Sequence, residues 1–395
     1  GVSRASPLQQ AIDKAPSGAV IALGPGFYEG NIAISKPLTL RASGKGVVIH
    51  GDGTGSVITV TASYVTVDGL TIENSGPKHQ TVDAGITVRG ADNVKILRNR
   101  IRDCLFGINF EQTNRSVIED NDITSLPVSL GLKGDGIRLW YSHGNLIRMN
   151  RTRYVRDNVF WYSSANKIYE NSGADSRYSL HFMYADRNEI LSNDYRRNSV
   201  GIFLMFSQGS TLKRNFVADS TGPFGIGIGM KESSDILVEE NQILYNARGF
   251  YLDSSPYQPG TFNTFRGNEI NFNTTAFLLH GTLLPSLFES NVFKGNIEDV
   301  ANDTPESKLE INTWRSNYWD NYEGFDRNDD GYGDIPHEQW MYADRIWSYL
   351  PAAKFFYASP VLDFMNFLWR LMPFSEPVLL ARDARPQIRE RGTEK

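Results

Sequence analysis

The sequence predicts an all-β fold, a right-handed parallel β-helix (a solenoid) built from short strands. Two marks repeat along the chain and keep phase with each other. The first is an asparagine that closes segments of the type apolar-x-x-Asn, and it recurs every 21 to 29 residues. Its positions are Asn74, Asn99, Asn121, Asn150, Asn171, Asn193, Asn215, Asn241, Asn268 and Asn291. The second is a small residue followed by an apolar one, roughly 14 residues earlier, as in Gly107-Ile108, Gly136-Ile137, Ser179-Leu180, Gly201-Ile202 and Gly227-Ile228.

The residues between these marks explain the repeat. Apolar side chains alternate over only three to five residues, which is typical of short strands. A coil of about 22 residues cannot bury its apolar face alone, so it must stack on neighbouring coils. Asparagine tolerates left-handed backbone at a turn and can bond to the asparagine of the next coil, which predicts a ladder. The absence of a 3.6-residue period and of a regular LxxLxL pattern excludes helical and leucine-rich solenoids.

The two ends of the repeat differ from its middle. Ser6 as N-cap and Pro7 at the first helical position predict a short helix that covers the first coil. We therefore expect a β-helix with its helical cap over residues 1–311. Residues 312–380 form a C-terminal capping or docking region, dense in tryptophan and tyrosine, with an acidic loop and an apolar segment. Residues 381–395 are polar and predict an extended tail.

Composition limits the function. The net charge is −5 and no block of lysine and arginine stands out, which argues against a nucleic-acid partner. Cys104 is the only cysteine, so no internal disulfide can form, and we expect it to be a buried small side chain. No run reaches the roughly 20 apolar residues that span a bilayer. The chain begins at Gly1 without methionine, which predicts either a removed signal peptide or residues left from a tag.

An acidic glycine-containing loop follows the repeats. Residues 326–334 fit the first three-quarters of a calcium loop, D-x-N-x-D-G-x-x-D. The candidate calcium ligands are Asp326, Asn328, Asp330, the carbonyl of Tyr332 and Asp334. The position where a closing glutamate is expected holds His337, and Glu338 comes one residue late. The alternative is an acidic solvent loop held by turns.

Aligning the middle coils on their asparagines reveals a row of soft ligands. The position ten residues before the asparagine holds Trp140, Trp161, Met183 and Met205. Two residues earlier stand Arg138, Val159, His181 and Phe203. Their neighbours are better core candidates, so this row should face outward. These core candidates are Ile137, Leu139, Leu180, Phe182, Ile202 and Leu204.

Thioethers beside an imidazole make a soft site. Cu(I) prefers such ligands, and an indole face can cover a cation. We therefore name His181, Met183, Met205 and Trp161 as copper candidates. The alternative is that they pack under a loop or a partner. His337 and Met341 form a second, weaker candidate pair, with helical i, i+4 spacing.

The apolar segment at residues 355–374 is interrupted by charge and by prolines, so it is too broken to span a membrane. Three roles remain open. It could cap the last coil, lie on a membrane surface, or dock on a membrane partner.

Several segments together resemble the NosD family. They are the helix residues 6–12, Pro25-Gly26-Phe27-Tyr28-Glu29-Gly30-Asn31, Lys36-Pro37-Leu38-Thr39-Leu40, Asn317-Tyr318-Trp319-Asp320 and the loop at 326–334. The coils are weakly specific, whereas Asn-Tyr-Trp-Asp followed by the acidic loop is much more specific. The resemblance implies a periplasmic protein, peripheral to the inner membrane, that is not an enzyme. It also implies work with an ABC transporter membrane subunit and a copper-carrying lipoprotein, assisting assembly of the copper–sulfur cluster of nitrous oxide reductase.

A carbohydrate-active enzyme or a sugar-binding module remains the alternative, because the same fold serves both. A glycosidase needs paired carboxylates, but the acidic residues here are scattered beside turn asparagines. A lyase needs a base and a cation to neutralise a uronate, and only Arg138 and Tyr141 could be assigned these roles.

Overall fold

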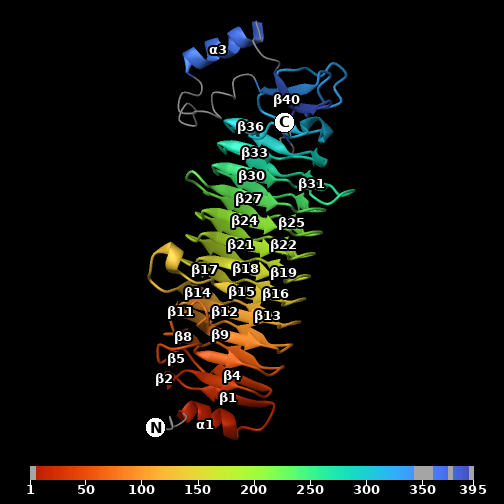
Figure 1. The fold of residues 1–395 in the computed structure, drawn as a ribbon. Coiled ribbons are helices and arrows are strands. Elements are labelled where there is room, and N and C mark those ends of the chain that lie inside the picture. The colour runs from red at the N-terminus through yellow and green to blue at the C-terminus, as the bar shows by residue number, and fades with distance from the viewer. Residues whose placement is uncertain (1–5, 342–358, 372–376, 391–395) are drawn as a thin grey trace. The chain divides into compact units, whose positions relative to one another are not determined.

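The computed structural model describes residues 6–341, 359–371 and 377–390 (Figure 1). The chain divides into two compact units, Gly1–Val217 and Ala218–Lys395. In each unit, three strands per coil build three parallel sheets, here called A, B and C. Parallel strands joined by crossovers are right-handed in nearly all proteins, so the fold is the right-handed parallel β-helix that the sequence predicts.

The first unit contains nine strands of sheet A, nine of sheet B and eight of sheet C, each paired with the strand one coil away. Sheet A contains β1 (Ala19–Leu23), β4 (Leu38–Ala42), β7 (Thr66–Asp68), β10 (Lys95–Leu97), β13 (Val117–Glu119), β16 (Leu146–Arg148), β19 (Lys167–Tyr169), β22 (Glu189–Leu191) and β25 (Thr211–Lys213). Sheet B contains β2 (Gly26–Glu29), β5 (Val47–His50), β8 (Thr71–Glu73), β11 (Arg100–Cys104), β14 (Asp122–Ser125), β17 (Arg151–Arg153), β20 (Ser172–Ala174), β23 (Asp194–Arg196) and β26 (Phe216–Ala218), which ends at the unit boundary. Sheet C contains β3 (Ile32–Ile34), β6 (Ile58–Val60), β9 (Ala84–Arg89), β12 (Phe106–Glu111), β15 (Ile137–Trp140), β18 (Asp157–Trp161), β21 (Tyr178–Met183) and β24 (Val200–Met205).

The second unit repeats this arrangement. Sheet A contains β28 (Leu237–Glu239), β31 (Asn263–Arg266), β34 (Ser286–Glu289), β37 (Thr313–Arg315), β40 (Val378–Asp383) and β39 (His337–Met341). Sheet B contains β29 (Gln242–Leu244), β32 (Glu269–Asn271), β35 (Val292–Lys294) and β38 (Tyr318–Trp319). Sheet C contains β27 (Ile226–Lys231), β30 (Arg248–Asp253), β33 (Thr275–His280) and β36 (Glu298–Asn302). Single 3-10 turns stand at Leu130–Leu132 and Leu309–Ile311.

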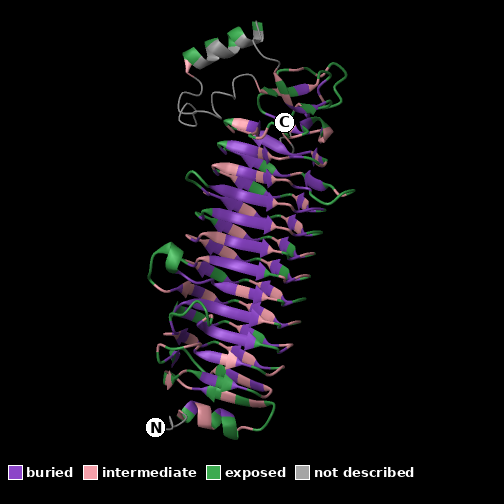
Figure 2. Cartoon of the chain, in the orientation of Figure 1, coloured by how far each residue is buried: buried purple, intermediate pink, exposed green. Residues whose placement is uncertain are grey.

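The interior of the coils is apolar. The six core candidates of the sequence, from Ile137 to Leu204, are all buried, with exposed fractions of 0–3%. Figure 2 shows that buried residues dominate the strands of sheet C. Cys104 is buried as expected, and burial raises the pKa of its thiol to about 12. It is therefore an inert core residue.

The asparagine ladder is confirmed, with one correction. In the first unit it runs from Asn99 through Asn193, and each backbone N–H donates to the side-chain oxygen of the next asparagine at 2.8–3.0 Å. Asn74 does not belong to it. Leu70 holds the ladder position in that coil and donates its N–H to Asn99 at 3.0 Å. Asn74 instead lies at a corner with φ 67° and donates to the carbonyl of Gly51.

The left-handed residue at each corner is not the ladder asparagine but the residue before it. Arg98, Asp120, Met149, Glu170 and Ser192 have φ of 52–56°. Few side chains adopt this conformation without support. The asparagine that follows each of these residues supplies that support. Its buried ladder hydrogen bonds fix the direction of the chain after the corner.

The amino-terminal cap forms as expected. Helix α1 (Pro7–Lys14) starts at Ser6, whose hydroxyl accepts the N–H of Gln9 at 3.2 Å. Leu8 and Ile12 are buried. The Gln9 amide bonds to both backbone groups of Ala33, at 2.8 and 3.1 Å, and so holds the helix on β3.

The carboxyl-terminal boundaries differ from those expected. The coils continue beyond residue 311, because β37 pairs with β34 and β38 pairs with β35. The expectation of an extended tail from residue 381 is wrong for residues 381–390. That boundary falls inside β40, which pairs with β37 and β39. Asp383 is fully buried and ends the ladder of the second unit, accepting the N–H of Asn317 at 2.8 Å and the indole N–H of Trp319 at 3.3 Å.

The Gln339 amide on β39 links two buried titratable groups, Asp299 and His337. Burial raises the pKa of Asp299 to about 7 and lowers the pKa of His337 to about 4. The Gln339 amide nitrogen lies 2.8 Å from the His337 ring and 3.5 Å from the Asp299 carboxylate. The folded state therefore binds an extra proton at Asp299 between pH 3.8 and about 7. It lacks a proton at His337 between about pH 4 and 6.5.

These two effects have opposite signs. As the pH rises, the contribution of Asp299 to the free energy of unfolding falls, whereas the contribution of His337 rises. The two contributions therefore oppose each other between about pH 4 and 6.5. Asp299→Asn should leave only the histidine slope. The free energy of unfolding of this variant, measured in urea, should then rise with pH more steeply than that of the wild type, by about 1.4 kcal/mol per pH unit. Parallel pH profiles for the two proteins would contradict this assignment.

Candidate metal centre

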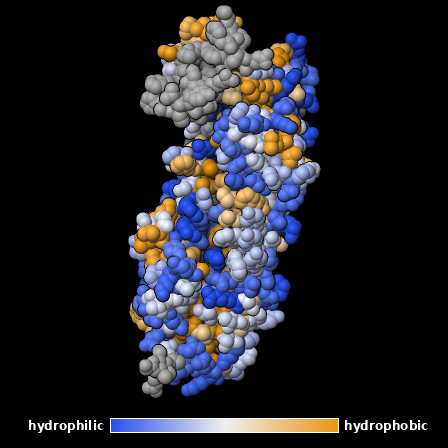
Figure 3. Space-filling view, viewed as in Figure 1, coloured by the Kyte–Doolittle hydropathy of each residue, from blue (hydrophilic) through white to orange (hydrophobic). Residues whose placement is uncertain are grey.

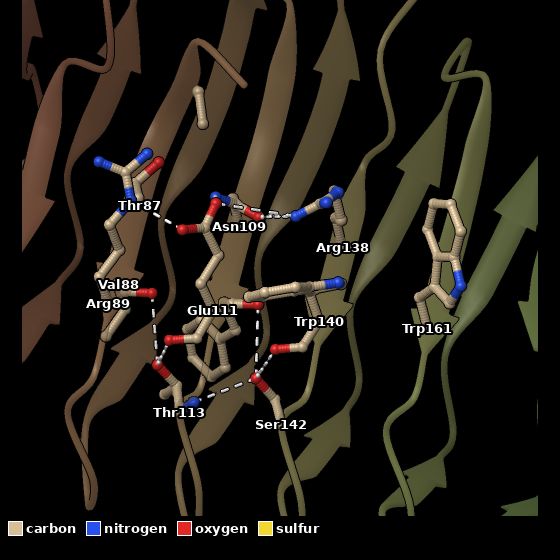
Figure 4. A network of polar contacts seen from close by, with 12 residues as sticks. Thr87, Val88, Arg89, Asn109, Glu111, Thr113, Arg138, Trp140, Ser142 and Trp161 are labelled. Carbon is tan, nitrogen blue, oxygen red and sulfur yellow. Dashed lines mark hydrogen bonds and ion pairs between the residues drawn. The ribbon is translucent and has the colours of Figure 1, made fainter. Parts of the chain in front are cut away.

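Strand pairing in sheet C builds the row that the sequence predicts. Trp140 on β15 pairs with Trp161 on β18, which pairs with Met183 on β21, which pairs with Met205 on β24. Two residues earlier in each strand, Arg138, Val159, His181 and Phe203 pair in the same way. Figure 4 shows the two tryptophans on neighbouring strands, with Arg138 beside Trp140.

The row faces outward but is only partly exposed. Trp161 is 37% exposed, and Met183 and Met205 are half-buried. Charged and polar side chains lie beside the tryptophans. Arg89 donates to Glu111 at 2.8 Å, and Arg138 donates to Asn109 at 2.8 Å, as Figure 4 shows. The soft ligands therefore occupy one end of a longer polar face.

His181 is the centre of the soft cluster. Its Nε2 lies 3.4 Å from the Met205 sulfur, and its Nδ1 lies 3.3 Å from Asp157 Oδ2. The residue is 8% exposed. The ring of Tyr178 stands edge-on to it, with centroids 4.7 Å apart. The imidazole is thus enclosed on several sides, with one nitrogen directed to a thioether and the other to a carboxylate.

Asp157 is itself strongly held. Arg177 donates to it from Nε at 2.8 Å and from Nη2 at 2.5 Å. Burial works to raise the pKa of Asp157, but the hydrogen bonds from Arg177 and His181 outweigh it and keep the pKa below its usual value. The side chain is 3% exposed. A buried, ionised carboxylate therefore lies behind the imidazole.

The preceding coil carries a related pair without an imidazole. Asp135 is fully buried and accepts from Arg156 at 3.2 Å. Burial raises the pKa of Asp135 to about 6, although Arg156 opposes this shift. The residues that strand pairing aligns with His181 in the two preceding coils are Val159 and Arg138.

The sequence analysis missed Asp157, Arg177 and Tyr178. The spacing of the charged residues could have revealed the first two. Asp157 and Arg177 are 20 residues apart, and Asp135 and Arg156 are 21 apart, so each pair is separated by about one coil. Tyr178 carries no such signal. It is three residues before His181, and strict alternation would put the two on opposite faces. The pairing of β18 with β21 shifts by one residue between Asp157 and Val159, and this bulge brings both rings to the outer face.

The carboxylates of the acidic loop already accept hydrogen bonds from the protein itself. Asp326 accepts the N–H of Gly331 at 2.8 Å, and Asp334 accepts the N–H of Arg327 at 2.8 Å. Asp330 accepts from the Arg385 guanidinium at 2.7 Å, which lowers its pKa. Asn328 lies 3.2 Å from Asp330. Within the described ranges, no group of three or more His, Cys, Asp or Glu side chains is arranged to hold a metal ion.

The residues after this loop do not complete a calcium site. His337 is buried against Trp319, and Glu338 pairs with Arg382 at 3.5 Å. The helical interpretation of His337 and Met341 is wrong, because both lie in strand β39. Four residues of a strand span about 13 Å, so these two side chains cannot share one ion.

The comparisons with known proteins identify the family. The family model described as "Periplasmic copper-binding protein (NosD)" matches residues 123–324, just over half of the chain. The chain belongs to the NosD family. The matched region of this NosD-family chain includes every candidate copper ligand and stops before the acidic loop. A right-handed β-helix model matches residues 41–152.

Two curated relatives of this chain carry the name "Probable ABC transporter binding protein NosD". The one from Pseudomonas aeruginosa is 27% identical, over 98% of this chain and 92% of its own length. The one from Stutzerimonas stutzeri is 28% identical, over 89% and 83%. The resemblance inferred from the sequence motifs is therefore confirmed.

Among solved structures, the NosD chain is similar to carbohydrate-active β-helix enzymes. The A-module of the Azotobacter vinelandii mannuronan C-5 epimerase AlgE6 aligns with TM-score 0.58 and 18% identity, over 78% of this chain and 93% of that chain. The periplasmic alginate epimerase AlgG aligns with TM-score 0.52 and 14% identity, over 75% and 82%. At these identities the likeness shows the fold alone. Among the described residues, no helix has the length and hydropathy needed to cross a bilayer.

Proposed function

We propose that this protein is a periplasmic Cu(I)-carrying factor that assists copper–sulfur cluster assembly in nitrous oxide reductase. The observation that carries the proposal is the contact between His181 Nε2 and the Met205 sulfur, 3.4 Å apart. Metal–nitrogen and metal–sulfur bonds at comparable sites are about 2.0–2.3 Å long, so one ion can reach both atoms. Copper is here the cargo of the protein.

The donor set fits this cargo. One imidazole and the two thioethers of Met183 and Met205 are ligands that Cu(I) prefers to hard oxygen donors. The Trp161 indole is the adjacent member of the same row and would cover one side of the ion. The half-buried methionines leave one side open, which a carrier needs in order to pass the ion on.

The direct test is a Cu(I) titration under reducing conditions with a competing chromophoric chelator. The expected result is one high-affinity ion per chain, with sulfur and nitrogen ligands in copper-edge X-ray absorption. Absence of uptake, or an ion bound only by oxygen ligands, would overturn the proposal.

An ABC transporter partner is supported by the names of the two curated relatives, and a copper-carrying lipoprotein and the reductase complete the proposed pathway. We propose that helix α3 (Pro360–Leu371) contacts the membrane subunit of the transporter. Val361, Phe364, Leu368 and Leu371 recur at three- and four-residue spacing and are 43–68% exposed. The space-filling view shows apolar surface on this helix (Figure 3).

Phe364→Asp should therefore weaken co-purification with the transporter by tenfold or more, because it places a charge in an apolar contact. The matched control is Phe224→Asp, which changes an 80% exposed phenylalanine on a loop outside α3. Equal retention by both variants would exclude α3. Binding of the wild type to protein-free vesicles, lost in Phe364→Asp, would assign the helix to the lipid surface instead.

The acidic loop stays a calcium prediction. Its side chains provide hard oxygen donors, but the closing carboxylate is missing and Arg385 already neutralises Asp330. Arg385→Ala should therefore strengthen Ca²⁺ uptake, measured by calorimetry on chelator-treated protein. Arg382→Ala, which removes the partner of Glu338, is the control. If neither the wild type nor Arg385→Ala takes up Ca²⁺, the loop is structural.

The alternative function, a carbohydrate-active enzyme or sugar-binding module, has a specific cluster in its favour. His181, Asp157, Arg177 and Tyr178 combine an acid–base pair with a cation and a phenol. Two features weaken it as uronate chemistry. Arg177 is already paired with Asp157, and burial raises the pKa of Tyr178, so less of the phenolate that would act as the base is present. Depolymerisation and epimerisation assays on uronate polymers separate the two functions, and turnover lost in Tyr178→Phe would favour the enzyme.

A further inference from the structure

We infer that Asp157 is a positioning residue that fixes His181 in the tautomer whose Nε2 is free to bind a soft ion. The expected effect on metal affinity rests on the proposed function, whereas the tautomer of His181 can be tested without it. Asp157 was not among the candidate residues of the sequence, and it touches the cluster only through the histidine, at 3.3 Å from Nδ1.

The first step concerns the proton on the imidazole. An ionised carboxylate can only accept hydrogen bonds. Asp157 accepts two hydrogen bonds from Arg177, whose guanidinium cannot deprotonate, and so forms a buried ion pair with it as a carboxylate. In the neutral imidazole, Nδ1 must therefore carry the proton and donate it. The lone pair then resides on Nε2, which faces the Met205 sulfur at 3.4 Å.

The second step concerns the orientation of the ring. Tyr178 stands edge-on to His181 at 4.7 Å and also lies 6.1 Å from the Phe203 ring. Arg177 lies over the Tyr178 ring, 4.8 Å from its centroid. Arg177 thus holds both the carboxylate and the aromatic wall. The imidazole therefore packs edge-on against a ring that is covered by Arg177, the same residue that holds the Asp157 carboxylate.

The third step is energetic. Histidines that bind metals commonly donate their second nitrogen proton to a carboxylate, and losing that partner costs roughly 10- to 100-fold in metal affinity. Asp135 provides an internal comparison. It has the same arginine partnership one coil earlier, but the aligned positions there hold no histidine. Of these two Asp–Arg pairs, the one at Asp157 has an imidazole beside it, with methionines in the coil of that imidazole and in the next coil.

The test is Asp157→Asn with Asp135→Asn as the matched control, since each removes one carboxylate from a buried Asp–Arg pair. Nitrogen-15 NMR of the metal-free wild type at pH 8 should show His181 protonated at Nδ1. Asp157→Asn should shift the population toward the Nε2-protonated form, and Asp135→Asn should not. Cu(I) affinity should fall by about 10- to 100-fold in Asp157→Asn only.

The thermal unfolding of both variants is measured as well. A general loss of structure should appear in Asp135→Asn as much as in Asp157→Asn. An Nε2-protonated wild type, or a tautomer unchanged in Asp157→Asn, would overturn the inference. If the wild type takes up no Cu(I), the proposed function fails, and the NMR measurement still decides the role of Asp157.

Discussion

Replacing Met205 with leucine should lower the affinity for Cu(I) at least tenfold, equivalent to about 1.4 kcal/mol or more. Leucine preserves most of the volume of the side chain but offers no lone pair, so the loss would report coordination. The substitution should cost less than about 1.5 kcal/mol of stability. His181→Ala should abolish high-affinity binding, because it removes the nitrogen that lies 3.4 Å from the Met205 sulfur.

Met183→Leu should have a similar effect, since strand pairing places Met183 beside Met205. Met149→Leu is the control, because Met149 is 48% exposed at a corner of the same unit and outside the row. If Met183→Leu and Met205→Leu retain wild-type affinity, the two methionines only pack against their neighbours, and the copper proposal loses its ligands.

Removing one rung of the asparagine ladder should cause the largest loss of stability. In Asn171→Ala the backbone N–H of Asn150 loses its acceptor at 3.0 Å, and the side-chain amide of Asn150 loses the same oxygen at 3.0 Å. Each buried group left without a partner costs about 1–3 kcal/mol, so a total near 3 kcal/mol is expected. The measurements are equilibrium unfolding in urea and hydrogen exchange at the Asn150 amide.

Asn321→Ala serves as the control for this prediction, because Asn321 is exposed and outside the ladder. It should change the free energy of unfolding by less than about 0.5 kcal/mol. A loss in Asn171→Ala no larger than in the control would mean that the strands, and not the ladder, hold the corners in their left-handed conformation.

The parts of the molecule that could be predicted share one property: they depend on spacing along the chain. The alignment of Trp161, Met183 and Met205 follows from coil length and side-chain alternation, and strand pairing confirms it. The N-terminal cap at Ser6 is likewise local. Each of these needs only a residue type and a sequence interval.

The parts that escaped prediction depend on irregularities or on distant pairing. The bulge in β21 puts Tyr178 beside His181 and has no signature in residue types. The burial of Asp383 depends on β40 pairing with β37, across an interval of more than 60 residues. Asn74 fits the repeat pattern and still lies outside the ladder, because it stands at the corner after β8, beyond the ladder position that Leu70 occupies.

The stacking of coils has a consequence for how this family can change. His181 and Met205 are 24 residues apart and lie in consecutive coils, so the cluster is complete within two turns of the solenoid. Each coil touches only its neighbours. Duplication or deletion of whole coils elsewhere would alter the length of the molecule and the distance between its ends without disturbing the cluster. A single residue gained or lost within β21 or β24 would turn one ligand toward the core, because side chains alternate along a strand. Length is therefore free to evolve, while the phase of this one pair of turns is not.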